Sequence, residues 1–178
     1  MSEFNIIIAG FGGQGVLFAG RVLTLAGMLD GKEVSWLPSY GPEMRGGTAN
    51  CCVCTSNRPI GSPLVTAPDI LIALNRPSFD KFIGKVVPGG SAFVDSSFVD
   101  PALCGRDDIK SFFIPATRTV GSEGLLGLSN LFMLGKMVRE TAISTTKSIT
   151  QAIYEVTPQR NHHLIEPNLH AFELGATF

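Results

Sequence analysis

Phe4–Gly20 reads FNIIIAGFGGQGVLFAG, which predicts a buried β-strand, a glycine-rich turn and the start of a helix. Three consecutive isoleucines without polar alternation favour a strand over Phe4–Ala9 that is covered on both faces, as in a parallel sheet. Gly10, Gly12 and Gly15 then follow the spacing G-x-G-x-x-G. Such a turn is too tight for Cβ atoms, and it leaves backbone N–H groups free at a helix N-terminus, where an anion can bind.

The glycine turn allows two interpretations. In the first, Gly12, Gly13, Gln14 and Gly15 offer backbone and side-chain donors to a phosphate or pyrophosphate. In the second, the glycines only permit the close packing that the first strand–helix turn of an open α/β sheet requires, and nothing binds there. The pattern alone leaves both interpretations open.

The residues beyond the turn argue against a nicotinamide dinucleotide as the ligand. Its ribose usually needs an acidic side chain at the end of the second strand, roughly 20 residues after the glycines. The second strand is predicted over Glu33–Leu37, and it continues into the sequence PSY rather than into an acid. The nearby acids, Asp30 and Glu33, lie before or at the start of that strand, which is the wrong end.

A second irregular segment follows this strand. Residues 38–47, PSYGPEMRGG, contain two prolines and three glycines, which exclude regular secondary structure. The segment nevertheless carries Tyr40, Glu43 and Arg45. Open α/β folds bind ligands in loops at the carboxyl edge of the sheet, so we expect this loop to lie beside the glycine turn. Arg45 would supply positive charge to a phosphate or a carboxylate, and Tyr40 and Glu43 would orient the loop or contact a partner chain.

Composition narrows the class of protein. The chain has 178 residues, which favours one domain over 1–178, with 44% apolar and only 16% charged residues and a mean hydropathy of +0.25. So little charge suggests that other chains cover part of the surface, and a homodimer of the isolated chain stays open.

A net charge of −1 gives no electrostatic support for nucleic-acid binding. No apolar run approaches the ~20 residues of a membrane span and no signal-peptide pattern is present, so we expect a cytoplasmic protein without membrane contact.

The cysteines and histidines predict no metal site. Cys51, Cys52 and Cys54 belong to one predicted strand, in which Cys52 and Cys54 share a face, and Cys104 is remote. Because no C-x-x-C spacing occurs, we expect them to pack as small apolar side chains. The three histidines lie near the C-terminus without a nucleophile or a carboxylate pattern around them, so no catalytic residue is predicted either.

The rest of the chain alternates strands with helices or loops and then becomes helical. Further strands are predicted over Thr48–Ser56, Asp69–Leu74, Ser91–Asp95 and Phe112–Pro115, and helices over Gln14–Leu29, Ser78–Ile83, Asn130–Thr141, Ser148–Val156 and Pro167–Gly175. Residues 57–61 predict a turn compatible with a hairpin, and residues 121–124 predict a loop. This order predicts an open, mostly parallel, Rossmann-like α/β sheet with helices on both faces and a helical C-terminal third.

Two motifs resemble the signatures of a known family. Residues 8–16, IAGFGGQGV, and residues 39–47, SYGPEMRGG, are similar to those of the gamma subunit of 2-oxoacid:ferredoxin oxidoreductases. Residues 69–75, 115–117, 130–135, 167–169 and 171–172 also match, so the resemblance covers nearly the whole chain. Met44 stands where pyruvate-type members tend to have a second arginine, and the second motif is therefore closer to the 2-oxoglutarate type.

The resemblance implies an enzyme subunit with no complete catalytic site of its own. Enzymes of this family decarboxylate a 2-oxoacid on thiamine diphosphate, pass electrons through iron–sulfur clusters to ferredoxin and release an acyl-CoA. The expected partners are alpha, beta and ferredoxin-like delta subunits, which hold the thiamine diphosphate and the clusters. The gamma chain helps to cover the active site and contributes to its coenzyme A side.

Coenzyme A is therefore the ligand that the resemblance implies for this chain. The candidate contacts are Gly12, Gly13, Gln14, Gly15, Ser39, Tyr40, Glu43, Arg45 and Gly46. Three alternatives stay open: an NAD(P)-binding oxidoreductase domain, a purely structural assembly subunit, and a subunit of indolepyruvate oxidoreductase. The sequence does not decide which 2-oxoacid is used or how many subunits assemble.

Overall fold

The computed structural model of the protein describes residues 3–39 and 48–178. The strands are β1 (Phe4–Phe11), β2 (Glu33–Ser39), β3 (Thr48–Ser56), β4 (Ile70–Ala73), β5 (Ser91–Asp95) and β6 (Lys110–Ile114). The α-helices are α1 (Val16–Leu29), α2 (Arg76–Phe82), α3 (Ala116–Ser122), α4 (Ser129–Thr141), α5 (Thr146–Val156) and α6 (Ile165–Thr177). Short 3₁₀ helices occur at η1 (Ile83–Lys85), η2 (Pro101–Leu103) and η3 (Gln159–Leu164).

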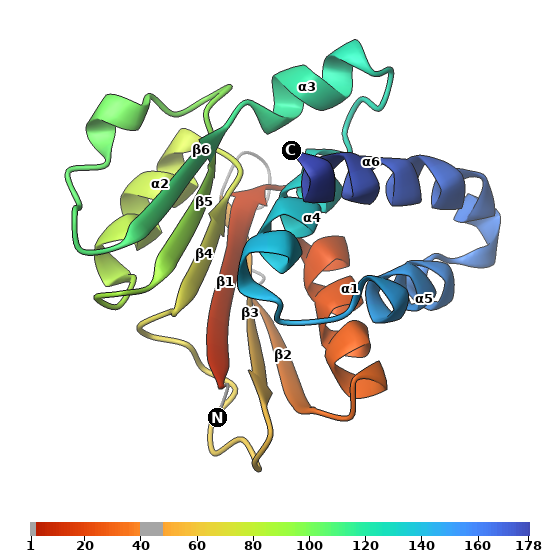
Figure 1. The fold of residues 1–178 in the computed structure, drawn as a ribbon, viewed down its shortest axis with the longest axis horizontal. Coiled ribbons are helices and arrows are strands. Elements are labelled where there is room, and N and C mark those ends of the chain that lie inside the picture. The colour runs from red at the N-terminus through yellow and green to blue at the C-terminus, as the bar shows by residue number, and fades with distance from the viewer. Residues whose placement is uncertain (1–2, 40–47) are drawn as a thin grey trace.

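The strands form one sheet in the order β2-β3-β1-β4-β5-β6 (Figure 1). Strands β1, β4, β5 and β6 run parallel to one another, whereas β3 is antiparallel to both β1 and β2. The predicted open α/β sheet is confirmed, and it is a mixed sheet. Strand β3, and not β2, pairs with β1, so the connection through α1 does not lead to a neighbouring strand.

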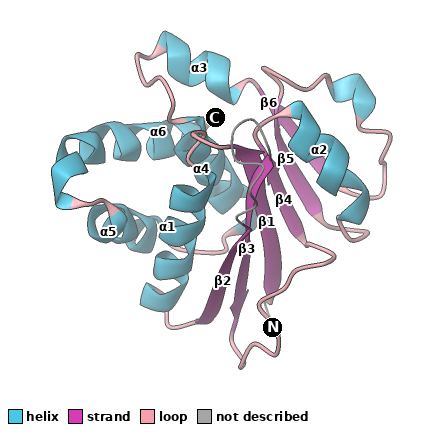
Figure 2. Cartoon of the chain, turned by 180° about the vertical axis from the view of Figure 1, so that it is seen from behind, coloured by secondary structure: helices cyan, strands magenta, loops and turns pink. Residues whose placement is uncertain are grey.

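Helices cover both faces of the sheet, as predicted (Figure 2). Helix α1 packs on β1, β2 and β3, and α5, α4 and α6 lie on the same side, whereas α2 packs on β1 and β4 from the other side. Ile6 and Ile8 belong to the core on the α1 side, and Ile7 belongs to the core on the α2 side. The isoleucine run of β1 is therefore uninterrupted because both of its faces are buried.

The cysteines of β3 lie as predicted. Cys51 belongs to the core on the α1 side, and Cys52 and Cys54 belong to the core on the α2 side. All three are buried and reduced. Burial raises the pKa of the Cys51 thiol to about 12, so this side chain stays a neutral thiol and packs as a small apolar group.

Several predicted elements differ from the structure. Strand β2 continues through Pro38 and Ser39, which were assigned to the irregular segment, because β2 is an edge strand and an edge strand tolerates a proline. Helix α1 begins at Val16 rather than Gln14, because Gly15 has the left-handed φ of 70° and stands outside the helix. Helix α3 was not predicted, and it takes up the first half of the expected loop at 121–124, since its seven residues are too few to show a helical stripe. The turn at 57–61 does not open a hairpin, because the next strand, β4, pairs with β1 and not with β3.

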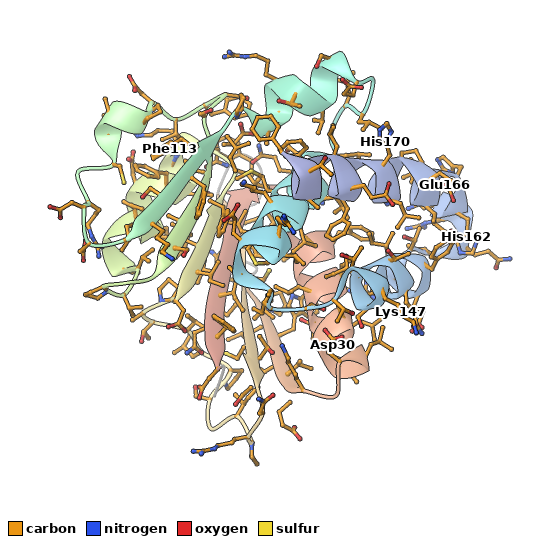
Figure 3. All side chains as sticks on the ribbon, in the orientation of Figure 1. Asp30, Phe113, Lys147, His162, Glu166 and His170 are labelled. Carbon is orange, nitrogen blue, oxygen red and sulfur yellow. The ribbon has the colours of Figure 1, made fainter. Side chains whose placement is uncertain are left out.

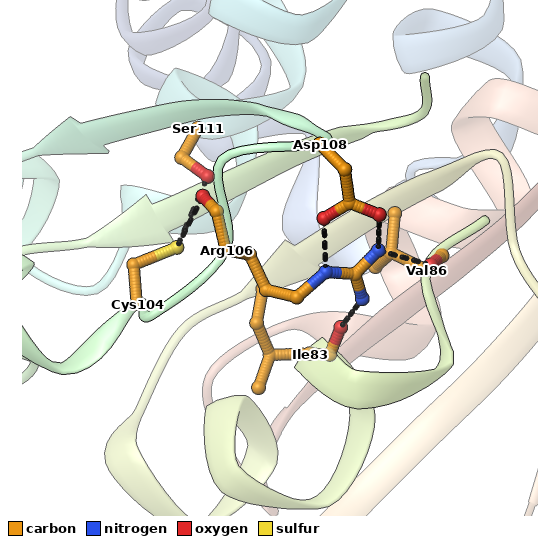
Figure 4. Close-up of polar contacts among 6 residues, drawn as sticks. All are labelled: Ile83, Val86, Cys104, Arg106, Asp108 and Ser111. Atoms are coloured by element: carbon orange, nitrogen blue, oxygen red, sulfur yellow. Dashed lines mark hydrogen bonds and ion pairs between the residues drawn. The ribbon is translucent and has the colours of Figure 1, made fainter. Parts of the chain in front are cut away.

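Arg106 connects the segment before β6 to η1 and the residue after it through hydrogen bonds (Figure 4). Its guanidinium donates to the carbonyls of Ile83 and Val86 at 3.2 and 3.1 Å, and it pairs with both carboxylate oxygens of Asp108. The hydrogen bonds from Arg106 lower the pKa of Asp108 below its ordinary value. This contact orders the outer edge of the sheet and lies away from the glycine turn.

Candidate functional site

The glycine turn lies at the carboxyl end of β1, near Ser39 and Thr48, the two described residues on either side of residues 40–47. Phe11 is the register partner of Thr48, and Ala9 is the partner of Asn50, which in turn pairs with Ser39. Ser39 and Thr48 therefore lie at the same sheet edge as the turn, and the predicted position of the loop between them stays a prediction. The predicted site residues Tyr40, Glu43, Arg45 and Gly46 lie outside the described residues.

A hollow of about 240 Å³ opens beside the turn and is bordered by the first turn of α1. Gly12, Gly13 and Gly15 line it, together with Phe11 and Phe18, and no described lining residue is charged. Because no side-chain charge faces this hollow from the described residues, an anion in it would rely on backbone N–H groups and on residues from elsewhere.

Ser39 does not share this hollow. It lines a second one of about 320 Å³, together with Asn50, Cys52 and Lys81, on the α2 side of the sheet. The structure thus brings Ser39 to the predicted edge but places it on the opposite side of the sheet from the glycine hollow. Among the described residues, three of the predicted contacts, Gly12, Gly13 and Gly15, line one hollow, Ser39 lines another, and Gln14 lines neither.

The N-terminus of α1 has no side-chain cap among the residues that the structure describes. Gly15 is the N-cap residue, no side chain of the described residues accepts from the first-turn N–H groups, and the first turn holds no acid. The first N–H groups of a helix have no partner inside the helix, and they give its N-terminus a partial positive charge. The hollow therefore adjoins an uncapped, electropositive end of a helix, which is suited to an oxyanion.

Gln14 points back into the protein rather than outward. Its Oε1 accepts from the Phe11 N–H at 2.7 Å and from Asn75 Nδ2 at 2.9 Å. Its Nε2 donates to the Leu74 carbonyl at 3.2 Å. The side chain thus connects the glycine turn to the end of β4, and its predicted role as a donor to a ligand stays a prediction.

Asn75 and Asn130 support the turn, although no sequence pattern marks them as site residues. Asn75 Oδ1 accepts from the Ser78 N–H at 2.9 Å and caps α2, while its Nδ2 bonds Gln14. Asn130 Nδ2 donates to the Gly15 carbonyl at 3.0 Å. Both residues lie in segments that resemble the family, 69–75 and 130–135, but only the tertiary structure shows that they contact the glycine turn.

Asp95 is a third buried polar group at this edge that the sequence did not reveal. It is 0% exposed at the end of β5, and its carboxylate accepts from Thr117 Oγ1 at 2.6 Å and from the backbone N–H groups of Ser97 and Thr117. All of these partners belong to the chain itself, so Asp95 anchors the start of α3 and is not a free acid.

The histidines are distant from the glycine turn. His162 and His170 lie on η3 and α6 with exposed side chains (Figure 3). Among the described residues, no group of three or more histidine, cysteine or acidic side chains has a metal-binding arrangement. Nor is any helix of that part long and apolar enough to cross a bilayer.

The sequence matches a known family and curated members of it. Residues 5–178 match the family model described as pyruvate ferredoxin/flavodoxin oxidoreductase. A 2-oxoglutarate synthase subunit, KorC, of Methanocaldococcus jannaschii is 38% identical over 173 residues, which cover 96% of this chain and 91% of the relative. A ketoisovalerate oxidoreductase subunit, VorA, of Methanothermobacter marburgensis is 36% identical over 98% of this chain, but the chain spans only 36% of that relative's length.

The fold also has solved counterparts. The gamma subunit of a keto/oxoacid ferredoxin oxidoreductase from Geobacter sulfurreducens superposes with a TM-score of 0.82 at 28% identity, covering 97% of this chain and 95% of that one. A 2-oxoglutarate:ferredoxin oxidoreductase from Magnetococcus marinus shares the fold with a TM-score of 0.88 at 22% identity over 99% of this chain and 31% of its own. The resemblance drawn from the two motifs is confirmed, and the chain belongs to the pyruvate ferredoxin/flavodoxin oxidoreductase family.

Proposed function

We propose that the chain is the gamma subunit of a 2-oxoacid:ferredoxin oxidoreductase and that it binds part of coenzyme A. The observation that carries the coenzyme A role is the uncapped N-terminus of α1 beside the glycine hollow. Coenzyme A brings phosphates and an elongated uncharged arm. The phosphates suit the free N–H groups of the turn, and Phe11 and Phe18 offer apolar surface to the remainder.

We further propose 2-oxoglutarate as the oxoacid. Met44 in the second motif and a KorC relative that aligns over 91% of its length both favour it, although the VorA relatives act on ketoisovalerate by name. The partners are alpha, beta and delta subunits, which would hold thiamine diphosphate and iron–sulfur clusters and pass electrons to ferredoxin in the cytoplasm. Thiamine diphosphate supplies the decarboxylation chemistry, and this chain's own residues bind and orient coenzyme A.

The fold supports this proposal over an NAD(P)-binding domain. In a dinucleotide-binding fold the acid that recognises the ribose ends a strand adjacent to β1. Here β3 lies between β1 and β2, so the end of β2 is two strand spacings, about 10 Å, from β1. Its last residue is Ser39 and not an acid.

We expect the isolated chain to show no 2-oxoacid-dependent reduction of a dye acceptor. Turnover should appear only when the partner subunits are added, and it should depend on coenzyme A, because the catalytic groups lie on the partners. The measurement is a reconstitution assay in which each subunit is omitted in turn and 2-oxoglutarate, ketoisovalerate, pyruvate and indolepyruvate are compared. Turnover by this chain alone, or micromolar NAD(H) binding in a calorimetric titration, would contradict the proposal. Full activity without the chain would contradict both the proposal and a purely structural assembly role.

Arg45→Ala should raise the KM for coenzyme A of the reconstituted complex about tenfold, which corresponds to about 1.4 kcal/mol of lost binding. A cation in a segment rich in glycine and proline is expected to contact an anion, because such a segment packs no core. Arg45→Lys should recover only part of the loss, since an ammonium cannot copy the planar guanidinium. Arg160→Ala, at an exposed position of η3, is the matched control. Unchanged kinetics for Arg45→Ala would make it an ordinary surface residue.

A further inference from the structure

Three carboxamide side chains surround the glycine turn and come from three parts of the fold. Gln14 belongs to the turn itself, Asn75 lies between β4 and α2, and Asn130 lies in the first turn of α4. Asn75 and Asn130 are only 2% and 4% exposed. None of the three lines the glycine hollow, so they can act on a ligand there only through the backbone of the turn.

The carboxamides of Gln14 and Asn75 are held in one orientation each. Asn75 must present its oxygen to the Ser78 N–H, and its Nδ2 therefore faces Gln14 Oε1. Gln14 in turn must present its oxygen to the Phe11 N–H and its nitrogen to the carbonyl of Leu74, the residue after β4. Turning either amide over would break at least two hydrogen bonds, so the pair fixes the first half of the turn against β4 and α2.

Asn130 holds the second half of the turn. Its Nδ2 donates to the Gly15 carbonyl, which also accepts from the Ala19 N–H at 3.0 Å. A Cβ atom at Gly15 would overlap the Asn130 carboxamide, and Gly15 has a φ of 70°, so only glycine fits this contact. The turn is thus held from both sides, by β4 and α2 through Asn75 and by α4 through Asn130.

Asn130 is also unfavourable for stability in one respect. Its Oδ1 is buried and has no hydrogen-bond partner among the described residues. A buried acceptor without a partner costs stability, and such departures from ordinary packing are expected at functional sites. The contact with Gly15 is therefore better explained by a need to place the turn than by a need to stabilise the fold.

We propose that Gln14, Asn75 and Asn130 are positioning residues that hold the glycine turn in its ligand-binding geometry before coenzyme A arrives. This inference rests on the proposed coenzyme A role of the turn. Since an anion at this position is held by N–H groups of a fixed backbone, loosening the backbone weakens binding without removing any contact atom. The cost should therefore fall on the KM for coenzyme A and not on turnover at saturation.

The test uses the reconstituted complex and the variant Asn75→Asp. Aspartate keeps an oxygen for the Ser78 N–H and so keeps the cap of α2, but it lacks the Nδ2 donor and places a second oxygen against Gln14 Oε1. We expect the KM for coenzyme A to rise about tenfold while kcat changes less than about twofold. Asn130→Ala is the second variant, and it should raise the KM in the same way without lowering the melting temperature, because it also removes the unpaired Oδ1.

Two further variants distinguish a failure of the positioning role from a failure of the proposed coenzyme A role. Asp80→Asn breaks only the exposed pair with Arg76 on α2, and it should leave the kinetics unchanged. Gly12→Asp places a carboxylate in the turn itself, and it should raise the KM if the turn binds coenzyme A. A raised KM for Gly12→Asp with wild-type values for Asn75→Asp and Asn130→Ala would overturn the positioning role alone. Wild-type values for all three would overturn the coenzyme A role as well, and a loss of stability with an unchanged KM would make the carboxamides purely structural.

Discussion

Gly175→Ala should lower the free energy of unfolding by about 3 kcal/mol or more, or prevent folding. Helices α4 and α6 cross where Gly135 of α4 faces the backbone of α6 and Gly175 of α6 faces the backbone of α4. A Cβ atom at Gly175 would overlap the Phe132 carbonyl, and one at Gly135 would overlap the Phe172 carbonyl. Neither obstacle is a flexible side chain, so a methyl group must push two helix backbones apart and open the core around Phe132 and Phe172, which are 0% and 1% exposed.

The measurement is denaturant unfolding of the chain, with the midpoint and the slope compared between variants. Gly135→Ala should behave like Gly175→Ala, because both block the same crossing. Gly84→Ala is the matched control, since nothing lies within 4 Å of its Cβ position, and it should change stability by less than about 0.5 kcal/mol. Equal midpoints for Gly175→Ala and Gly84→Ala would show that the helices do not cross this closely.

Asp30→Asn should destabilise the chain by about 2 kcal/mol at neutral pH, because it weakens several hydrogen bonds to one carboxylate. Asp30 follows α1 and faces the start of α5 (Figure 3). It accepts from Ser144 Oγ and Ser148 Oγ at 2.5 Å each, and from both the backbone N–H and the hydroxyl of Thr145. A carboxylate at a helix N-terminus is further stabilised by the partial positive charge there.

The same contact predicts a pH dependence. Burial by itself raises the pKa of Asp30, but the hydrogen bonds from Ser144, Ser148 and Thr145 outweigh it and hold the pKa below its ordinary value. Because the folded-state pKa lies below the unfolded value of ~3.9, this stabilisation is complete above that pH. It is lost as the pH falls through the folded-state pKa.

Stability measured against pH for the wild type and Asp30→Asn should therefore differ by a constant amount near neutrality, and the difference should begin to shrink only below about pH 4 and vanish below the folded-state pKa of Asp30. Glu173→Gln, at an exposed position of α6, should run parallel to the wild type. A difference between wild type and Asp30→Asn that persists unchanged into acid would mean that the charge of Asp30 contributes nothing to the α1–α5 junction.

The elements with strong local patterns were predictable from the sequence. The isoleucine run of β1, the glycine turn, the stripes of α4 and α5 and the small cysteines of β3 each report burial of a local face, and the structure confirms them. The α/β class follows from their order. Helix α3 could not be predicted, because its seven residues are too few to show a helical periodicity. Its start is fixed by the hydrogen bond between Asp95 and Thr117, which are far apart in the sequence.

The candidate site was only partly predictable. The glycine turn and the sequence motif at residues 39–47 stand out because they are rich in glycine and proline. Gln14 is predicted to donate a hydrogen bond to a ligand, yet its side chain is hydrogen-bonded to the Leu74 carbonyl and to Asn75 inside the protein. That Ser39 and the glycine turn line hollows on opposite sides of the sheet depends on the register of β2 with β3, which the amino-acid pattern does not state.

The sequence by itself determined most of the strands and the longer helices, and that an open helix N-terminus follows β1, because these depend on contacts within a few residues. Only the tertiary structure decided that β3 separates β1 from β2, that two glycines let α4 and α6 touch, and that Asn75 and Asn130 hold the turn. The hydrogen bonds of the turn, for example, join residues 61 and 115 positions apart, Gln14 with Asn75 and Gly15 with Asn130. Pairing over such separations is set by the packing of the whole core, which no local pattern encodes.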